Sequence, residues 1–255
     1  MQTKTGVLLI LTTIIGVGAF LYPFFTITTP QASFGMAHSG DAPLILMVLL
    51  ALCLGVVVAE LETGQVNSKT IAILGILVAV NSVLRFIPGP AGFSAIFFLP
   101  ILCGYVYGSV FGFLLGALSI LVSALLGAGT GPWLPYQMFA TGWMGMSASL
   151  LRFLKRYPRA EVPALAIWGF GWGFLFGAIM NLWFWPYLLA PGNMYWSPGA
   201  GFLEALTRYG IFYLATSVWW DAGRAVGNFI LILALGRPVM TVLRRFQRRF
   251  QFVVL

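Results

Sequence analysis

Long apolar stretches run through almost the whole chain and are broken only by short polar or Gly- and Pro-rich segments. Most are about 15 to 25 residues long, close to the length of helix that crosses the hydrocarbon layer of a membrane. They lack the ten-residue alternation that is typical of membrane strands. Only 8% of the residues are charged, whereas a soluble domain has roughly 25%. The sequence therefore predicts an all-α, polytopic membrane helical bundle.

We predict eight spans, at residues 6–26, 42–60, 69–87, 93–107, 109–127, 135–153, 162–190 and 209–236. The first stretch follows Lys4 and is similar to a signal peptide. No small-x-small cleavage site stands before a mature polar domain, however, and more spans follow, so we expect a retained helix. The first two spans contain few polar residues and end in a polar linker. We therefore divide the chain into an appended two-helix unit (1–66) and a six-helix core (67–255).

The Lys and Arg residues are distributed unevenly, and this asymmetry predicts the topology. With both termini cytoplasmic, eleven of the 14 basic residues lie on the inner side: Lys4, Lys69, Arg152, Lys155, Arg156, Arg159, Arg237, Arg244, Arg245, Arg248 and Arg249. We therefore expect a multi-pass protein of the cell membrane with a basic cytoplasmic tail. The net charge of +8 reflects this topology and does not indicate nucleic-acid binding.

Three irregular segments rich in Gly, Pro and aromatic residues then face outward, at residues 86–93, 127–137 and 190–209. The second starts as a glycine-broken loop and continues into a helix whose first turn carries Tyr136 and Gln137. Irregular backbone at membrane depth is tolerated where it lines a cavity or is buried in protein. This segment therefore predicts the wall of a binding site, in which Trp133 can stack on a planar ligand; an ordinary inter-helix loop is the alternative.

Ionisable groups inside a membrane are costly and need a partner or a function. In the last predicted span, Asp221, Arg224 and Asn228 have spacings that share one helix face. We expect an ion pair that points into the bundle. Two interpretations stay open: the pair or Asn228 contacts a polar ligand, or the pair is an internal structural clamp.

Two other spans carry polar residues near their outer ends. Asn81 and Arg85 are four residues apart in the third span. Arg85 either extends to lipid head groups or receives an anionic group of a ligand. Asn181, one turn before Trp185, is a further candidate for ligand binding.

Small residues form ridges that allow helix backbones to approach closely. The ridges are Ala72, Gly75 and Ala79; Gly108, Gly112 and Gly116; and Gly169, Gly173 and Gly177. Packing within the bundle explains such ridges. For the first ridge, which lies on the cytoplasmic half of its span, a partner protein is the alternative.

Several common functional motifs are missing from the sequence. No Gly is followed by Lys, so the chain has no phosphate loop of the G-x-x-x-x-G-K-[ST] type and cannot be its own ATPase. G-x-S-x-G is also missing. His38 is the only histidine, which excludes a bis-His haem or a His-rich zinc site. Cys53 and Cys103 lie in apolar stretches and are interpreted as buried hydrophobic residues. We expect neither a cofactor nor a metal in this chain.

Residues 67–250 resemble the substrate-specific (S) component of energy-coupling factor (ECF) vitamin importers. The resemblance is carried by a small-residue helix that ends in Arg85, by the segments GYVYGSVFGFLLGAL and GAGTGPWLPYQMFATGWMG, by TSVWWDAGRAVGN, and by the basic end RPVMTVLRRFQRRF. The GPWLPYQM signature is fairly specific to the family and much less specific to a substrate.

The resemblance implies a six-helix subunit that captures a vitamin and works with a transmembrane coupling protein and two cytoplasmic ATPases. The family's A-x-x-x-A coupling motif corresponds to Ala72, Gly75 and Ala79. The strict form is absent, because Gly75 and Ala79 give G-x-x-x-A. The first two spans also depart from the six-helix pattern, and they either brace the bundle or obstruct one face of it.

The motifs are closest in style to members assigned to cobalamin or related corrinoids, while thiamine- and flavin-type ligands stay open. Two other classes of function are alternatives. One is an intramembrane enzyme that acts on a lipid or isoprenoid with Asp221 as its acid or base. The other is an assembly subunit without a ligand.

Overall fold

The computed structural model describes residues 3–27, 37–62, 68–87, 89–189 and 191–250. Its longer helices are α1 (Thr3–Leu21), α3 (Ala42–Glu62), α4 (Ser68–Leu84), α5 (Phe98–Tyr107), α6 (Ser109–Ser123), α7 (Leu134–Ala148), α8 (Pro158–Phe184), α9 (Phe202–Thr216) and α10 (Val218–Phe250). Short helical turns accompany them: α2 (Pro23–Thr26), η2 (Pro90–Gly92), η3 (Ala95–Phe97), η4 (Ala124–Ala128), η5 (Ser149–Arg156) and η6 (Trp185–Tyr187). The described residues contain no strand, which confirms the all-α prediction.

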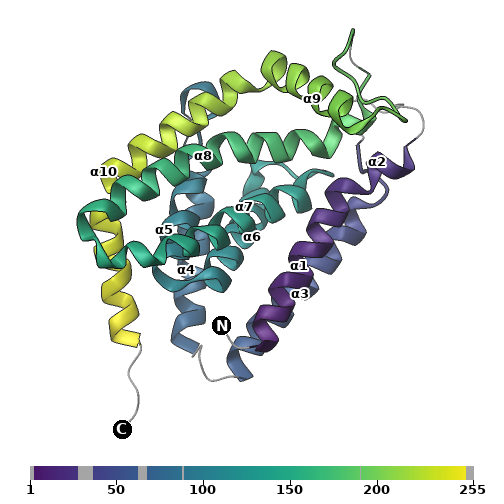
Figure 1. Ribbon diagram of the computed structural model, residues 1–255. Helices are drawn as coiled ribbons and strands as arrows, with labels where there is room; N and C mark the ends of the chain where they lie inside the picture. The colour runs from purple at the N-terminus through teal and green to yellow at the C-terminus, as the bar shows by residue number, and fades with distance from the viewer. Residues whose placement is uncertain (1–2, 28–36, 63–67, 88, 190, 251–255) are drawn as a thin grey trace.

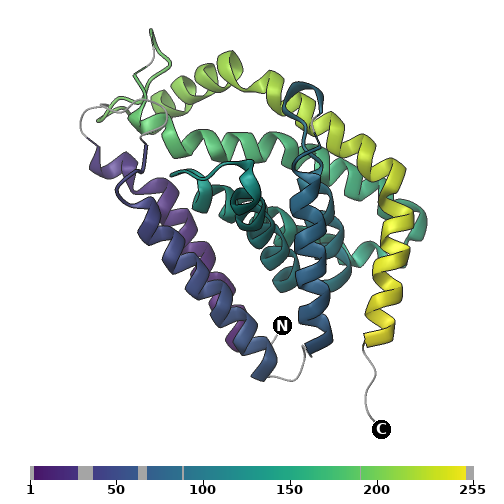
Figure 2. The same ribbon diagram turned by 180° about the vertical axis from the view of Figure 1, so that it is seen from behind.

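The helices form a bundle with two different flanks (Figure 1). Helices α1 and α3 lie side by side along one flank and pack against α7. Helices α5, α6 and α7 form the centre, and α8 and α10 pack along each other across it. The view from behind shows α4 on the other side of the centre, against α6 (Figure 2). The start of α1, the start of α4 and the end of α10 lie at the same end of the molecule.

Five helical segments are long and apolar enough to cross a membrane: Lys4–Thr26, Ala42–Glu62, Ser109–Ala128, Pro158–Tyr187 and Val218–Arg249. Two shorter apolar helices, Ser68–Leu84 and Ala95–Tyr107, fall at predicted spans. The first seven predicted spans thus each correspond to a helix, with ends that differ by several residues. Cys53 and Cys103 are buried and free, as expected from their apolar surroundings.

The predicted span at 209–236 is wrong, because the structure has two helices there. Helix α9 ends at Thr216, and the backbone of Ser217 leaves the helical region with φ −123°. The Ser217 hydroxyl accepts a hydrogen bond from Asn181 Nδ2 of α8, at 2.7 Å. Such a side-chain contact stabilises a break that the apolar pattern does not reveal. The predicted basic tail forms the end of a helix, since α10 continues to Phe250.

Glycines allow the central helices to touch through their backbones. A Cβ at Gly104 or Gly112 would collide with the backbone of Gly145 in α7, and one at Gly116 would collide with Thr141. Gly108, between α5 and α6, has φ +115°, a conformation that side chains resist. On the other side of the bundle, Gly173 and Gly177 of α8 face Ala225 and Asp221 of α10. Two of the three small-residue ridges therefore serve packing within the chain.

Replacing Gly145 with Leu should disrupt the contact between α6 and α7. Because the new side chain meets backbone rather than a flexible side chain, we expect a loss of about 3 kcal/mol or more, at or beyond the usual cost of overpacking. The measurement is thermal unfolding of the detergent-purified protein. Gly171→Leu is the matched control, since nothing lies within 4 Å of a Cβ there. Equal unfolding temperatures for the two variants would refute this packing.

Candidate functional site

Arg85 connects the ends of three helices. It follows the last turn of α4, and its Nη1 donates to Ser123 Oγ at the end of α6, at 2.9 Å. Its Nη2 donates to Gln137 Oε1 in the first turn of α7, at 3.0 Å. The structure therefore brings two predicted site residues, Arg85 and Gln137, into direct contact across 52 residues of sequence. Both side chains are half-buried, so this contact lies at an accessible edge of the bundle.

The charge of Arg85 is not balanced by a carboxylate among the described residues. Its two described hydrogen-bond partners are a neutral hydroxyl and a neutral amide. By contrast, Arg224 forms an ion pair with Asp221, and Arg244 forms one with Glu161. A partly buried cation without a counterion is costly in a medium of low dielectric constant. An anionic ligand group at Arg85 would remove that cost.

The glycine loop before α7 joins the two hydrogen-bond partners of this cation, Ser123 and Gln137. Gly127 and Gly129 both have positive φ, 112° and 97°, so the chain turns sharply where α6 ends. The loop is largely exposed. Trp133 then begins α7 as a half-buried side chain, and its ring meets Trp183 of α8 edge-on, with centroids 6.3 Å apart. Backbone polar groups, an aromatic ring and a cation are thus available around one loop.

Tyr136 serves a different purpose from the predicted ligand contact. It is fully buried, and its hydroxyl lies 2.6 Å from His38 Nδ1 and donates to Asp41 Oδ2 at 3.0 Å. Tyr22 also donates to Asp41 Oδ2, at 2.6 Å. The Tyr136 hydroxyl therefore attaches α7 to the turn before α3, and the shared carboxylate of Asp41 connects both to Tyr22 at the end of α1. The edge of its ring meets Phe20, which extends the same contact.

His38, which is buried, and Asp41, which is half-buried, form a couple that was not predicted from the sequence. His38 Nδ1 lies 2.8 Å from Asp41 Oδ2, and because a carboxylate only accepts, Nδ1 carries the proton. Burial alone would raise the pKa of Asp41, but hydrogen bonds from His38 and Tyr22 outweigh it and lower that pKa below its ordinary value. The carboxylate is therefore charged at neutral pH. A lone histidine three residues before an aspartate was the available signal in the sequence.

The two asparagines among the candidates join helices. Asn81 of α4 donates to the carbonyl oxygen of Ile96, at 2.9 Å, and so fixes η3 against α4. Asn181 donates to Ser217, as described above. Both side chains are buried. These contacts place both residues in the framework of the bundle.

The predicted ion pair in α10 is present and points into the bundle. Asp221 is 2% exposed, pairs with Arg224 and accepts a hydrogen bond from the Tyr213 hydroxyl at 2.8 Å. Arg224 also donates to the carbonyl oxygen of Gly173 and lies over the ring of Phe176, 5.0 Å from its centroid. Asn228, fully buried, donates to the carbonyl oxygen of Gly169. These contacts favour the structural-clamp interpretation of the pair.

Residues 90–93, in a segment predicted to face outward, lie against α10. Ala91, with φ +49°, fills the space above Gly223, and Phe93 fills the space above Gly227. A Cβ at either glycine would collide with these residues. These residues therefore pack on α10 at positions where glycine leaves room for them. Of the three irregular segments, the loop at 127–131 is the one that joins the two residues bonded to Arg85, Ser123 and Gln137.

The ridge of Ala72, Gly75 and Ala79 is exposed on α4. Nothing in the described part of the chain lies within 4 Å of a Cβ built on Gly75. Large apolar side chains beside it, Ile76 and Val80, are exposed as well. In contrast to the other two ridges, this one is not used for packing within the described part of the chain.

A family model described as the substrate-specific component of ECF transporters matches residues 69–242, which is more than half of the chain. The match covers α4 to most of α10, and the first three helices precede it. No curated protein and no solved structure shows significant similarity to the chain.

Replacing Asp41 with Asn should loosen α1 and α3 from α7. Because three donors share one oxygen of this carboxylate, we expect a loss of about 1–3 kcal/mol, seen as a lower unfolding temperature in detergent and faster hydrogen exchange in α3. Glu62→Gln is the matched control, since that exposed carboxylate pairs only loosely with Lys4, at 3.7 Å. If the two variants behave alike, the contact at Tyr136 does not hold these helices in place.

Proposed function

We propose that this chain, which belongs to the family of substrate-specific components of ECF transporters, captures a vitamin or related micronutrient for an ECF-type importer. Members of this family are membrane-embedded, substrate-binding transporter subunits and not enzymes. ATP hydrolysis then belongs to two separate ATPases, which a transmembrane coupling protein connects to this chain. The multi-pass helical structure agrees with a role in the membrane.

The observation that carries the proposal is the unbalanced charge of Arg85 beside the glycine loop. A ligand with an anionic group and a planar ring system would place the anion on Arg85 and the ring near Trp133. Gln137, already in contact with Arg85, would position the guanidinium. Among the candidate residues this group is the most accessible, because Asn81, Asn181, Asp221 and Asn228 are buried and bonded to the framework.

The substrate class follows from the same chemistry. A cobalamin-type corrinoid carries a phosphodiester and a large planar macrocycle, and flavin nucleotides combine a phosphate with a planar ring. We favour the corrinoid because it combines an anionic phosphodiester with a large ring system. Flavin nucleotides are an alternative of the same chemistry, and thiamine-type ligands, whose thiazolium ring is cationic, fit Arg85 only as phosphate esters. For each of these ligands the site opens at the end of the bundle opposite to most Lys and Arg residues. Because Lys and Arg are enriched on the cytoplasmic side, this topology has both termini in the cytoplasm and the site outside.

The ridge of Ala72, Gly75 and Ala79 is the proposed contact for the coupling protein. It is exposed in the chain, and small residues allow a partner helix to approach closely. Helices α1 and α3 pack against α7 and leave this ridge uncovered. We therefore interpret residues 1–66 as a brace for the core rather than as an obstruction of its coupling face.

The enzyme alternative receives no support from the geometry of Asp221. An acid or base must reach its substrate, whereas this carboxylate is 2% exposed and held by Arg224 and Tyr213. Gly177 of α8 lies so close to this carboxylate that even a Cβ at position 177 would collide with it.

Replacing Arg85 with Gln should weaken substrate binding at least tenfold. A tenfold loss corresponds to about 1.4 kcal/mol, a modest value for a charge-assisted contact at a partly buried site. The measurement is a titration of the purified protein with a panel of vitamins. Arg208→Gln is the matched control, because Arg208 is already paired with Glu204 at 2.8 Å. Unchanged affinity in Arg85→Gln would place the substrate elsewhere.

Replacing Gly75 with Leu should abolish assembly with the coupling protein and leave substrate binding intact, because a bulky side chain separates helices that pack through small residues. Co-purification with the coupling protein measures assembly. Gly55→Leu on α3 is the control, since a Cβ there also meets nothing within 4 Å. A Gly75→Leu variant that still forms the complex would show that coupling uses another surface.

A further inference from the structure

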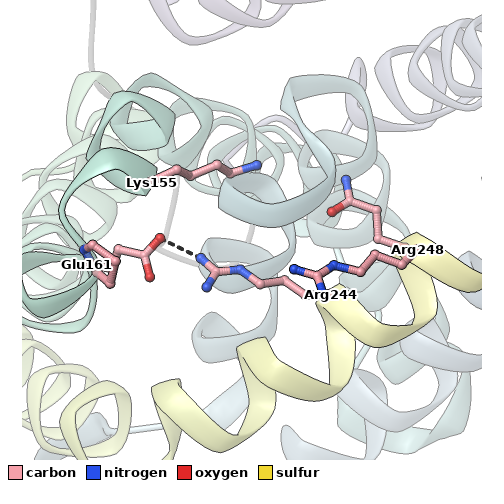
Figure 3. A pocket seen from close by; sticks show the side chains of 6 residues that line it. Lys155, Glu161, Arg244 and Arg248 are labelled. Carbon is pink, nitrogen blue, oxygen red and sulfur yellow. Dashed lines mark hydrogen bonds and ion pairs between the residues drawn. The ribbon is translucent and has the colours of Figure 1, made fainter.

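A second charged site lies near the end of α10, away from Arg85. A hollow of about 280 Å³ is formed there by the last residues of η5, the start of α8 and the last turns of α10. It is lined by Lys155, Pro158, Glu161, Arg244, Gln247 and Arg248. Figure 3 shows that Lys155 approaches this space from one side, and Arg244 and Arg248 approach it from α10.

The charges around the hollow do not balance. Glu161 is 4% exposed and accepts hydrogen bonds from the Tyr105 hydroxyl, at 2.6 Å, and from Arg244 Nη2, at 2.5 Å. This carboxylate therefore neutralises Arg244 and fixes its position. Lys155 and Arg248 have no acidic partner among the residues that the structure describes. The hollow thus keeps two positive charges in excess.

Lys155 is an exposed side chain that carries one of these charges. Desolvation lowers the pKa of its ammonium group, and repulsion from Arg152 and Arg244 lowers it further against the attraction of Glu161. Its Nζ has one neutral acceptor, the carbonyl oxygen of Val106, at 3.5 Å. Gln247 donates to the same carbonyl oxygen and so stands beside it in the hollow. An anion in this space would offset the repulsion.

The neighbouring surface identifies the kind of anion. A second hollow of about 410 Å³ shares Arg244 and Arg248 and is lined further by Thr241, Arg245 and Arg249, with no acidic residue. Large apolar side chains are exposed on two of the segments that form the first hollow. They are Leu150 and Phe153 on η5, and Val242 and Phe246 on α10. Cationic hollows next to exposed apolar side chains match a lipid, with its phosphate in the hollow and its acyl chains on the apolar residues.

We propose that the hollow between η5, α8 and α10 binds a phosphate-bearing anion, supplied by the head group of an anionic phospholipid. Lys155, Arg248 and Gln247 hold the phosphate, and Glu161 positions Arg244 beside it. The lipid joins the end of α10 to the start of α8, two segments that otherwise meet here through the pair of Glu161 and Arg244. This site is independent of the substrate site.

The test is native mass spectrometry of the full chain in micelles that contain phosphatidylglycerol, compared with micelles that contain only phosphatidylcholine. The double variant Lys155→Gln/Arg248→Gln should lose at least tenfold in affinity for phosphatidylglycerol. The double variant Lys69→Gln/Arg237→Gln removes the same two charge types outside the hollow and should bind like the wild type. Should the first double variant fail to fold, Arg248→Gln compared with Arg237→Gln answers the same question.

Inorganic phosphate alone distinguishes the two sources of the anion. The proposal expects saturation by the phospholipid at concentrations where inorganic phosphate binds weakly. Phosphate that saturates the hollow with no preference for the lipid would overturn the lipid assignment. Equal binding of phosphatidylglycerol by the hollow variant and its control, or no preference over phosphatidylcholine, would overturn the site.

Discussion

The backbone contact between α6 and α7 is the constraint on which the rest of the structure depends. Between helices in a membrane the hydrophobic effect gives little attraction, so close packing must hold them together. Gly112 and Gly145 permit that packing, since a side chain at either position would collide with backbone. With α6 and α7 fixed, Ser123 and Gln137 lie where Arg85 reaches both. The candidate substrate site is thus a consequence of a contact between glycines.

The sequence was sufficient for the elements that depend on local composition. Apolar length located the seven long helices from α1 to α8, and the small-residue spacing identified the ridges. The break at Ser217 was missed, because the apolar pattern continues across it and the stabilising hydrogen bond comes from Asn181, 36 residues away. Arg85 and Gln137 were both candidates, yet only the structure shows their contact. The role of Tyr136 was misjudged for the same reason, since its partners His38 and Asp41 are almost 100 residues distant.

The two ends of the bundle carry different electrostatic arrangements. At one end Arg85 is a single unbalanced cation beside aromatic rings and a glycine loop, which suits a discrete small ligand. At the other end several basic residues surround two hollows next to exposed apolar side chains, which suits a lipid head group. Between them, Asp221 and Arg224 neutralise each other inside the bundle. Charge without a partner therefore distinguishes the two proposed binding sites from the framework.

The central claim is that the chain captures a small molecule, and native mass spectrometry of the detergent-purified protein tests it most directly. We expect a bound species with the mass of a vitamin, either retained during purification or acquired from a panel that includes cobalamin, flavin and thiamine compounds. Saturable binding of one of them would identify the substrate. A preparation that assembles with the coupling protein but binds no member of the panel would contradict the account.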